Sequence, residues 1–325
     1  MKTVPFDRSR LTLLPLAGRC HDMTKETIAP LAPVDPGAVP APVLAVARRM
    51  VAAKQTGASI LFMMGAHVLR SGVQRFLTDL MARGYISAIA GNGACAIHDF
   101  ELALIGATTE SVAEYIRDGR FGLWKETGYV NDIVNQAFAT DPGQGFGEAL
   151  GREILNGDYP HKDVSLLAAG ARLGVHVGIH VALGQDIVHQ HENFDPAAAA
   201  TLSYNDFLKF AAQVENLENG VVMNFGTAVM GPEVFLKALA MARNAARSEG
   251  RTVEGFASLV ADLRDLGPDY SQEPEKTREN YYFRPQKTLL VRTLSGGESF
   301  YVKGRHENTV PALWTAVNMA EAGEA

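Results

Sequence analysis

The residues from Ala88 to Gly106 read A-I-A-G-N-G-A-C-A-I-H-D-F-E-L-A-L-I-G, and this stretch decides the fold class that the sequence predicts. The apolar run at 85–90 is short enough to be a strand covered on both faces, as strands of parallel sheets are. The small residues at 91–94 let a ligand approach the main chain closely. A helix is expected to begin near His98, so this turn lies at the carboxyl end of a strand, where open α/β sheets bind ligands.

Strand and helix patterns alternate along the rest of the chain. Strands are predicted at 59–64, 85–90, 175–182 and 220–225, and helices at 43–54, 73–83, 164–173, 204–217 and 232–248. This order predicts an α/β fold with a doubly wound, mostly parallel sheet. A helical insertion is expected at 110–136 and a polar loop that belongs to a site at 263–279. Residues 289–293 and 299–303 predict a closing hairpin before a helix that starts near Thr309.

The domain organisation follows from length and local composition. Residues 28–42 are rich in Pro and Ala, so 1–42 is predicted to be an irregular N-terminal arm. The remaining 43–325 is predicted to form a single α/β domain, because a chain of 325 residues can bury one large core.

Charge and cysteine content restrict the partners and the compartment. The formal net charge of -6 and the lack of a basic stripe argue against nucleic acid, whereas acidic groups can receive a cationic substrate. The two cysteines, Cys20 and Cys95, are too few for a disulfide framework and fit a reducing cytoplasm. No apolar run reaches the length of a membrane span, so we expect a cytoplasmic protein without a membrane partner.

Six of the nine histidines lie in or beside predicted strand ends, namely His67, His98, His176, His180, His189 and His191. A hydrogen-bonded structural histidine is the default interpretation for each. The H-x-H pattern at 189–191 with Asp186 could be part of a metal site, but local spacing supplies no third ligand. Asp186 and His191 could instead bind amino groups and move protons. We expect no metal.

Several motifs resemble the deoxyhypusine synthase family, including its bacterial deoxyhypusine synthase-like members. They are G-A-H-V-L-R-S-G (65–72), N-G-A-C-A-I-H-D-F-E (92–101), E-A-L-G-R-E-I (148–154), G-Q-D-I-V-H-Q-H (184–191) and V-V-M-N-F-G-T-A (221–228). The resemblance implies an NAD-binding, Rossmann-like fold assembled as a homotetramer, with sites at subunit interfaces. In that family NAD oxidises spermidine, and a lysine captures the aminobutyl group as an imine.

The resemblance also implies a set of site residues. His191 and Asp186 match positions that bind the substrate and are expected to be catalytic. The family's imine-forming lysine lies in a W-G-K triplet that this chain lacks, and Lys287 in R-P-Q-K-T-L-L is the nearest candidate. His189, Glu101 and His98 are expected at the substrate. The expected cofactor residues are Gly65, His67, Ser71, Gly72, Asn92, Gly93, Asn224, Gly226 and Thr227.

The sequence is therefore interpreted as an NAD-dependent transferase of polyamine metabolism that moves an aminobutyl-type group from a small cationic amine to an unknown acceptor. One alternative is a catalytically silent tetrameric sensor that keeps the NAD or ligand pocket. Another is a metal-dependent hydrolase built on His180, His189 and His191. Substrate-dependent formation of NADH separates the first two, and bound zinc or manganese would reveal the third.

Overall fold

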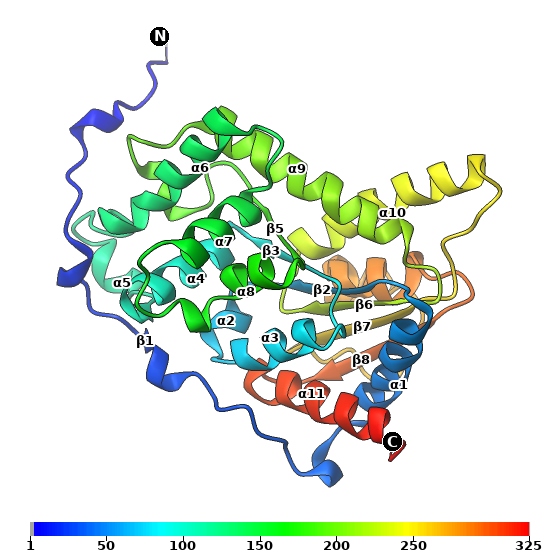
Figure 1. Ribbon diagram of the computed structural model, residues 1–325. Helices are drawn as coiled ribbons and strands as arrows, with labels where there is room; N and C mark the ends of the chain where they lie inside the picture. The colour runs from blue at the N-terminus through cyan, green and yellow to red at the C-terminus, as the bar shows by residue number, and fades with distance from the viewer. Residues whose placement is uncertain (1–2, 325) are drawn as a thin grey trace.

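A parallel sheet with helices on both faces organises the chain, as the computed structural model shows for residues 3–324 (Figure 1). The six strands of this sheet are ordered β5-β3-β2-β6-β7-β8, and neighbouring strands all run parallel. Their bounds are β2 (Ile60–Met64), β3 (Ala88–Asn92), β5 (His176–His180), β6 (Val221–Phe225), β7 (Ala257–Asp262) and β8 (Glu298–Lys303).

This strand order starts in the middle of the sheet, runs to one edge, and then returns to fill the other half. It is the order of a doubly wound Rossmann fold, and the α/β prediction is confirmed. The direction of winding reverses between β2 and β6. Gly65 follows β2 and Gly226 follows β6, and the two turns touch so closely that a Cβ atom on Gly65 would overlap the carbonyl oxygen of Gly226. Glycine at 65 therefore allows the two strand ends to meet.

The central strand β2 is buried on both faces. Ile60, Phe62 and Met64 belong to one hydrophobic cluster, while Leu61 and Met63 belong to another on the opposite face. Because both faces are covered, the strand reads as a continuous apolar run and not as an alternating pattern. This explains why short apolar runs located the central strands correctly.

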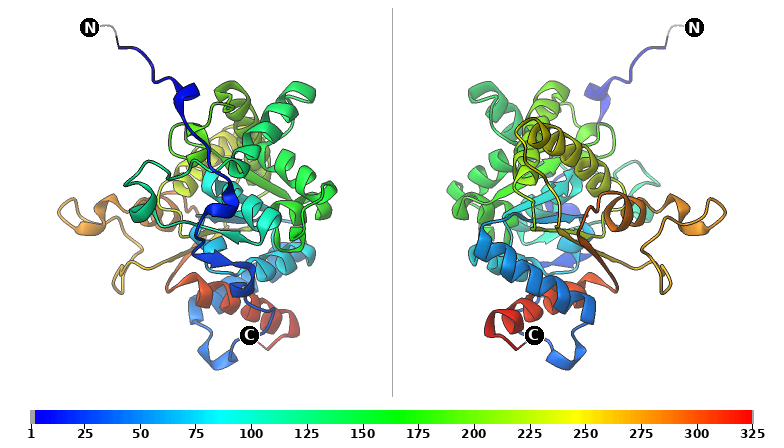
Figure 2. Two further views of the ribbon diagram at one scale, coloured as in Figure 1. Left: turned by 90° about the vertical axis from the view of Figure 1, so that its left-hand side faces the viewer. Right: turned by 90° about the vertical axis from the view of Figure 1, so that its right-hand side faces the viewer.

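The helices divide between the two faces of the sheet (Figures 1 and 2). Helices α9, α10 and the helix at Gln286–Arg292 contribute to the cluster on one face, and α1, α3 and α11 pack on the other. The bounds are α1 (Ala41–Thr56), α2 (His67–Arg70), α3 (Gln74–Ala82), α4 (Gly93–Ile105), α5 (Val112–Tyr115), α6 (Tyr129–Thr140), α7 (Phe146–Asn156), α8 (Leu166–Leu173), α9 (Pro196–Glu215), α10 (Met230–Ser248) and α11 (His306–Ala322). None of the described helices has the length and apolar character that crossing a membrane requires.

Two predicted elements differ from the structure. Helix α4 begins at Gly93 and not near His98, because the side-chain oxygen of Asn92 caps it by accepting a hydrogen bond from the Cys95 N–H. The hairpin prediction is wrong. Residues 286–292 are helical, and β8 pairs parallel with β7. Parallel neighbours need a long crossover, and the chain between them makes one that projects from the body (Figure 2).

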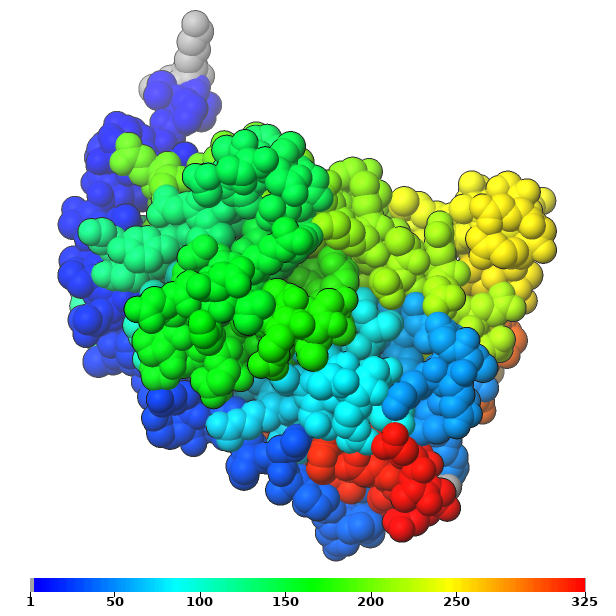
Figure 3. All heavy atoms as spheres, in the orientation of Figure 1, coloured from blue at the N-terminus to red at the C-terminus, as the bar shows by residue number. Residues whose placement is uncertain are grey.

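The N-terminal segment lies along one side of the protein, against the region that holds α5 (Figure 3). From residue 3 to residue 40 it contains short 3-10 turns and the strand β1 (Met23–Thr24), which pairs with β4 (Ala107–Thr108). Main-chain hydrogen bonds fix it at Leu14, whose N–H donates to the Leu123 carbonyl and whose carbonyl accepts from the Lys125 N–H. We call residues 3–40 the N-terminal strap. The division of the chain at residue 42 into an arm and one domain stays a prediction.

Candidate functional site

A cavity of about 450 Å³ lies at the carboxyl ends of β2, β3, β5 and β6, where the winding of the sheet reverses. We call it the switch-point cavity. Its lining includes five of the predicted cofactor residues, Gly65, Asn92, Gly93, Gly226 and Thr227. His180 at the end of β5 and Asp186 in the following loop complete one side. Ligands of open α/β sheets bind in this crevice.

The walls of the switch-point cavity suit a dinucleotide. Helices α4 and α10 begin beside it, and N–H groups at helix starts favour phosphate. The turn after β6 is held by the Asn224 side-chain N–H, which donates to the Thr227 carbonyl (3.1 Å), and by Thr227 Oγ1, which accepts from the Gly231 N–H (3.0 Å). The buried His180 Nε2 has no hydrogen-bond partner among residues 3–324. The residues present therefore fit such a cofactor, although the turns do not follow G-x-G-x-x-G.

The remaining predicted cofactor residues lie outside this lining. His67 is exposed at the start of α2, and Ser71 Oγ donates to the His67 carbonyl (2.9 Å). Gly72 has a positive φ and packs against the carbonyl of Thr27 in the N-terminal strap. Asn224 is buried behind the turn at 226–227. The first three lie beside α2 and the strap, and Asn224 supports the turn.

A second cavity of about 280 Å³ adjoins the first, and both are lined by Gln185 and Asp186. We call it the side cavity. Its other walls come from the N-terminal strap, α2, α4 and the segment at 109–121, through Arg19, Arg70, Ala94, Ile97, His98, Glu101, Thr109, Glu110, Val112 and Phe121, together with Ile187. Two predicted substrate residues, Glu101 and His98, are thus present.

Asp186 lies where the two cavities meet. Burial raises the pKa of its carboxyl group to about 6. His189 Nε2 lies 3.7 Å from Asp186 Oδ2. His189 Nδ1 accepts hydrogen bonds from the main-chain N–H groups of Gly184 (3.1 Å) and Asp186 (3.2 Å), so the ring proton of neutral His189 is on Nε2, facing the carboxylate. Asp186 therefore contacts His189, a predicted substrate residue, and not His191, with which it was predicted to act.

Glu101 is engaged inside the protein. Arg19 donates from both terminal nitrogens to the two carboxylate oxygens (2.9 and 2.6 Å), and Thr127 and Thr108 add hydroxyl hydrogen bonds. Burial opposes ionisation of Glu101, but Arg19 and the hydroxyl donors hold the pKa below its ordinary value. Because Thr108 Oγ1 donates to Glu101, it accepts from His98 Nδ1 (2.8 Å). Glu101 therefore has its charge neutralised before any ligand arrives.

Glu110 and Arg70 have different surroundings. Glu110 accepts hydrogen bonds from Trp124 Nε1 (2.7 Å) and the Gly122 main-chain N–H (3.1 Å), both neutral donors. Partial burial raises the pKa of Glu110. Arg70 forms no ion pair within residues 3–324. Sequence reasoning missed Arg70, Glu110 and Arg19. Arg70 could have been noticed as the cation within the 65–72 motif, whereas Arg19 had no local signal.

His191 lies outside the lining of both cavities. It is fully buried, and its Nε2 donates to the Gly122 carbonyl at 2.8 Å. The same glycine donates its N–H to Glu110 and packs against Ile187. His191 thus supports a turn that forms part of the side cavity, and its assignment as a catalytic residue stays a prediction.

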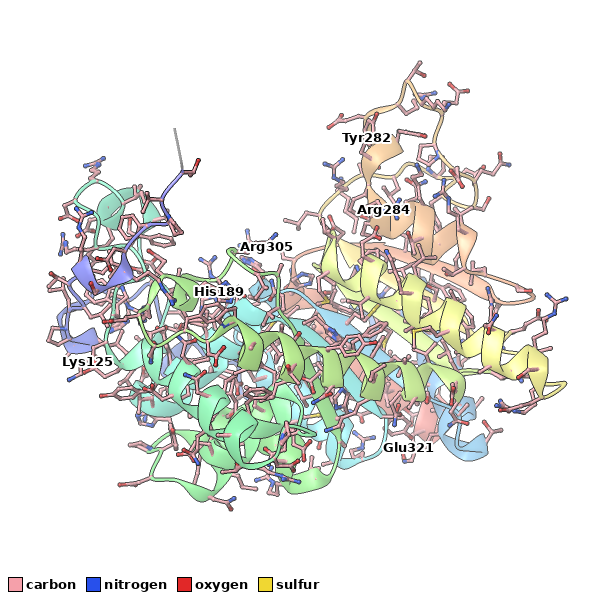
Figure 4. All side chains as sticks on the ribbon, turned by 90° about the horizontal axis from the view of Figure 1, so that it is seen from above. Lys125, His189, Tyr282, Arg284, Arg305 and Glu321 are labelled. Carbon is pink, nitrogen blue, oxygen red and sulfur yellow. The ribbon has the colours of Figure 1, made fainter. Side chains whose placement is uncertain are left out.

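Lys287 is also absent from the linings of the two cavities. It is buried in the helix 286–292, with Nζ 3.7 Å from the centre of the Tyr281 ring, and it lines neither cavity. Figure 4 shows Tyr282 and Arg284, from the adjoining part of the crossover, well apart from His189. Lys287 precedes no strand directly, since the residues after it are helical.

Within residues 3–324, no three His, Cys, Asp or Glu side chains gather in an arrangement that could hold a metal ion. His180, His189 and His191 form no such group. The structure therefore gives the hydrolase alternative no support.

Comparison with known proteins matches part of the sequence to a family other than the predicted one. Residues 44–135 match a family model described as arginine dihydrolase ArgZ-like, C-terminal, Rossmann fold. No curated protein matches the sequence. The matched region runs from α1 into α6 and contains β2, β3 and α4, so it includes two of the strand ends that border the switch-point cavity.

Similar solved structures include a conserved putative LOR/SDH protein from Methanococcus maripaludis S2, at 14% identity and a TM-score of 0.50, covering 92% of this chain and 74% of the other. AgrE in a ternary complex with ornithine and NAD+ matches at 13% identity and a TM-score of 0.50, covering 86% of this chain and 33% of AgrE. ArgZ, an arginine dihydrolase from the ornithine-ammonia cycle in cyanobacteria, matches at 12% identity and a TM-score of 0.48, covering 85% and 32%. This chain spans about a third of the length of ArgZ and AgrE.

The family-model match at residues 44–135 overturns the resemblance to deoxyhypusine synthase. The predicted aminobutyl transfer and its spermidine and polyamine substrates depended on that resemblance and are wrong. The assignment of Lys287 as a catalytic residue depended on it as well and stays a prediction. Glycine-rich turns after buried strands occur wherever a Rossmann-like sheet presents its carboxyl ends to a ligand, so such motifs do not separate the families. The family-model match and the strand order agree on a Rossmann-like fold.

Proposed function

We propose that this protein is an NAD-dependent enzyme that oxidises an amino acid at the carbon bearing its amino group. One observation carries the proposal: Asp186 lines both the switch-point cavity and the side cavity. A carboxylate at that junction can hold the ammonium group of a substrate beside a cofactor. The AgrE structure with ornithine and NAD+ supports it, since a chain of similar fold binds an amino acid together with this cofactor.

The switch-point cavity would hold the dinucleotide. The glycine turns at 65, 93 and 226 bring main chain to the cavity wall, and the start of α10 follows the turn at 226–227. NAD+ supplies the hydride acceptor when it is bound. The protein's contribution is to orient the substrate carbon toward the cofactor and to receive a proton.

Asp186 is the residue that would receive the proton. The ionised carboxylate attracts the substrate ammonium. During oxidation the hydrogen on the adjacent carbon leaves with its electron pair, one ammonium proton passes to Asp186, and the carbon–nitrogen bond becomes a double bond. The products are an iminium, the reduced cofactor and the protonated Asp186. Its pKa of about 6 suits this role, because such a carboxylate is ionised at neutral pH and is more basic than an ordinary one.

The test measures NADH formation when purified protein and NAD+ are mixed with a panel of L-amino acids. The expected result is NADH formation with at least one amino acid and its loss in the Asp186→Asn variant, while NAD+ binding is retained. A wild-type protein that binds NAD+ but forms no NADH with any amino acid would contradict the proposal. So would an Asp186→Asn variant with full activity.

A further inference from the structure

The side cavity contains charges that its own residues do not neutralise. We infer, on the basis of the proposed function, that it selects amino acids with a cationic side chain and that Glu110 is the residue that recognises this cation. The inference concerns specificity, a property separate from the oxidation itself.

Most ionisable groups in the side cavity are already engaged. Arg19 and Glu101 form a bidentate pair with each side chain about 1% exposed, so their charges cancel. Burial lowers the pKa of His98 to about 4, which leaves the ring neutral at pH 7. The groups that remain are one cation, Arg70, and two carboxylates, Glu110 and Asp186.

The charges of Arg70, Glu110 and Asp186 are complementary to those of a basic amino acid. Such a ligand carries one carboxylate, which Arg70 can bind, and two cations, one for each cavity carboxylate. Asp186 borders the switch-point cavity, so it is placed to bind the ammonium next to the carbon that is oxidised. The side-chain cation is then left for Glu110.

Glu110 is prepared for this role by its neighbours. Its two oxygens accept from Trp124 Nε1 and from the Gly122 N–H, which orient the carboxylate without cancelling its charge. No residue between 3 and 324 forms an ion pair with Glu110. The cavity lining also includes the apolar side chains of Ile97, Phe121 and Ile187, which suit the methylene groups of a basic side chain.

The test compares two ligands that share a carbon chain, L-ornithine and L-norvaline, of which norvaline lacks the terminal amino group. Calorimetric titration is done with wild type, Glu110→Gln and Glu114→Gln in the presence of NADH, which cannot accept a hydride, so that binding is measured without turnover. Glu114 is an exposed carboxylate on α5 and serves as the matched control. Wild type and Glu114→Gln are expected to prefer L-ornithine by about tenfold or more, since a charged hydrogen bond contributes about 1.5–3 kcal/mol. Glu110→Gln is expected to lose this preference while its affinities for L-norvaline and NADH stay unchanged.

The outcomes separate the inference from the proposed function. Equal binding of both amino acids to wild type, or an undiminished preference in Glu110→Gln, would overturn the inference and leave the proposed function standing. Failure of wild type to bind either amino acid with NADH present would instead overturn the amino-acid assignment itself. Melting temperatures of the three proteins establish that any change in binding occurs in a folded chain.

Discussion

The carboxylate of Asp186 lies directly against the Cα atom of Gly93, so that a Cβ atom at residue 93 would overlap Asp186 Oδ2. This contact joins the loop that follows β5 to the first residue of α4. It also places the carboxylate at the boundary between the two cavities, since Gly93 lines the switch-point cavity and Ala94 lines the side cavity. The absence of a side chain at 93 is therefore a requirement of the proposed site.

Replacing Gly93 with alanine tests this contact. The added methyl group is expected to displace Asp186, to abolish amino-acid-dependent NADH formation, and to lower the free energy of unfolding by about 1–3 kcal/mol, as overpacking does. Gly18→Ala is the matched control, because nothing lies within 4 Å of a Cβ atom there. Kinetics and urea unfolding of both variants provide the measurement. Normal activity in Gly93→Ala would show that the position of Asp186 does not matter.

The buried pair of Arg19 and Glu101 predicts a large stability effect. Arg19→Met leaves the Glu101 charge buried without its partner and is expected to lower the free energy of unfolding by about 3–5 kcal/mol. The double variant Arg19→Met with Glu101→Gln should recover part of this loss, because no buried charge remains. Lys303→Met breaks the exposed pair with Asp265 and should cost less than about 1 kcal/mol. Urea unfolding measures all three, and an equal cost for Arg19→Met and Lys303→Met would refute the prediction.

His191→Ala is expected to reduce turnover while NAD+ binding stays largely intact. The histidine donates to the Gly122 carbonyl, and Gly122 donates to Glu110, so its removal loosens a wall of the side cavity and leaves the switch-point cavity unchanged. Initial rates and NAD+ titration give the comparison. An equal loss of both would mean that His191 supports the fold as a whole.

Asp206 predicts a pH-dependent difference in stability. Burial raises its pKa to about 7, although Oδ2 accepts from the main-chain N–H groups of Gly147 and Ile179 (2.8 Å each). The folded chain thus binds the Asp206 proton more tightly than the unfolded chain, in which an aspartate has a pKa of about 3.9. The Asp206 contribution to stability is present at low pH and is lost as the pH rises through about 7.

An Asp206→Asn variant can keep the two hydrogen bonds through its amide oxygen and carries no charge. Its free energy of unfolding relative to wild type should therefore increase between about pH 4 and pH 7 and level off above that range. Urea unfolding at several pH values gives this difference, and Asp206→Ala, which removes the acceptor, serves as the comparison. A difference that is constant with pH would indicate an Asp206 with an ordinary pKa.

The fold class could be predicted from the sequence because both faces of the sheet are covered. Strands such as 60–64 and 221–225 then stand out as short apolar runs between helical patterns. The crossover before β8 could not be predicted in this way, because β8 is an edge strand and only Tyr301 and Val302 within it are buried. A half-exposed strand after a glycine turn looks like a hairpin unless its partner strand is known.

The candidate site was predictable only where it follows strand ends. Gly93 was identified from the small residues after an apolar run, Gly65 and Gly226 from the motifs at 65–72 and 221–228, and Asp186 from its spacing to the histidines. Arg19 and Glu101 lie 82 positions apart in the sequence, so no local pattern indicates their pairing. Family membership was misjudged for a related reason, since the motifs report the turns that the sheet requires and not the chemistry that takes place beside them.

The central claim is that the switch-point cavity binds NAD+, and calorimetric titration with NAD+ tests it most directly. Ala228 lines this cavity and is exposed, so Ala228→Trp would fill the cavity without disturbing the core, and Ala240→Trp on the exposed surface of α10 is the matched control. The account predicts stoichiometric binding to wild type and Ala240→Trp and its loss in Ala228→Trp. Absence of binding to wild type, or equal binding to all three proteins, would contradict it.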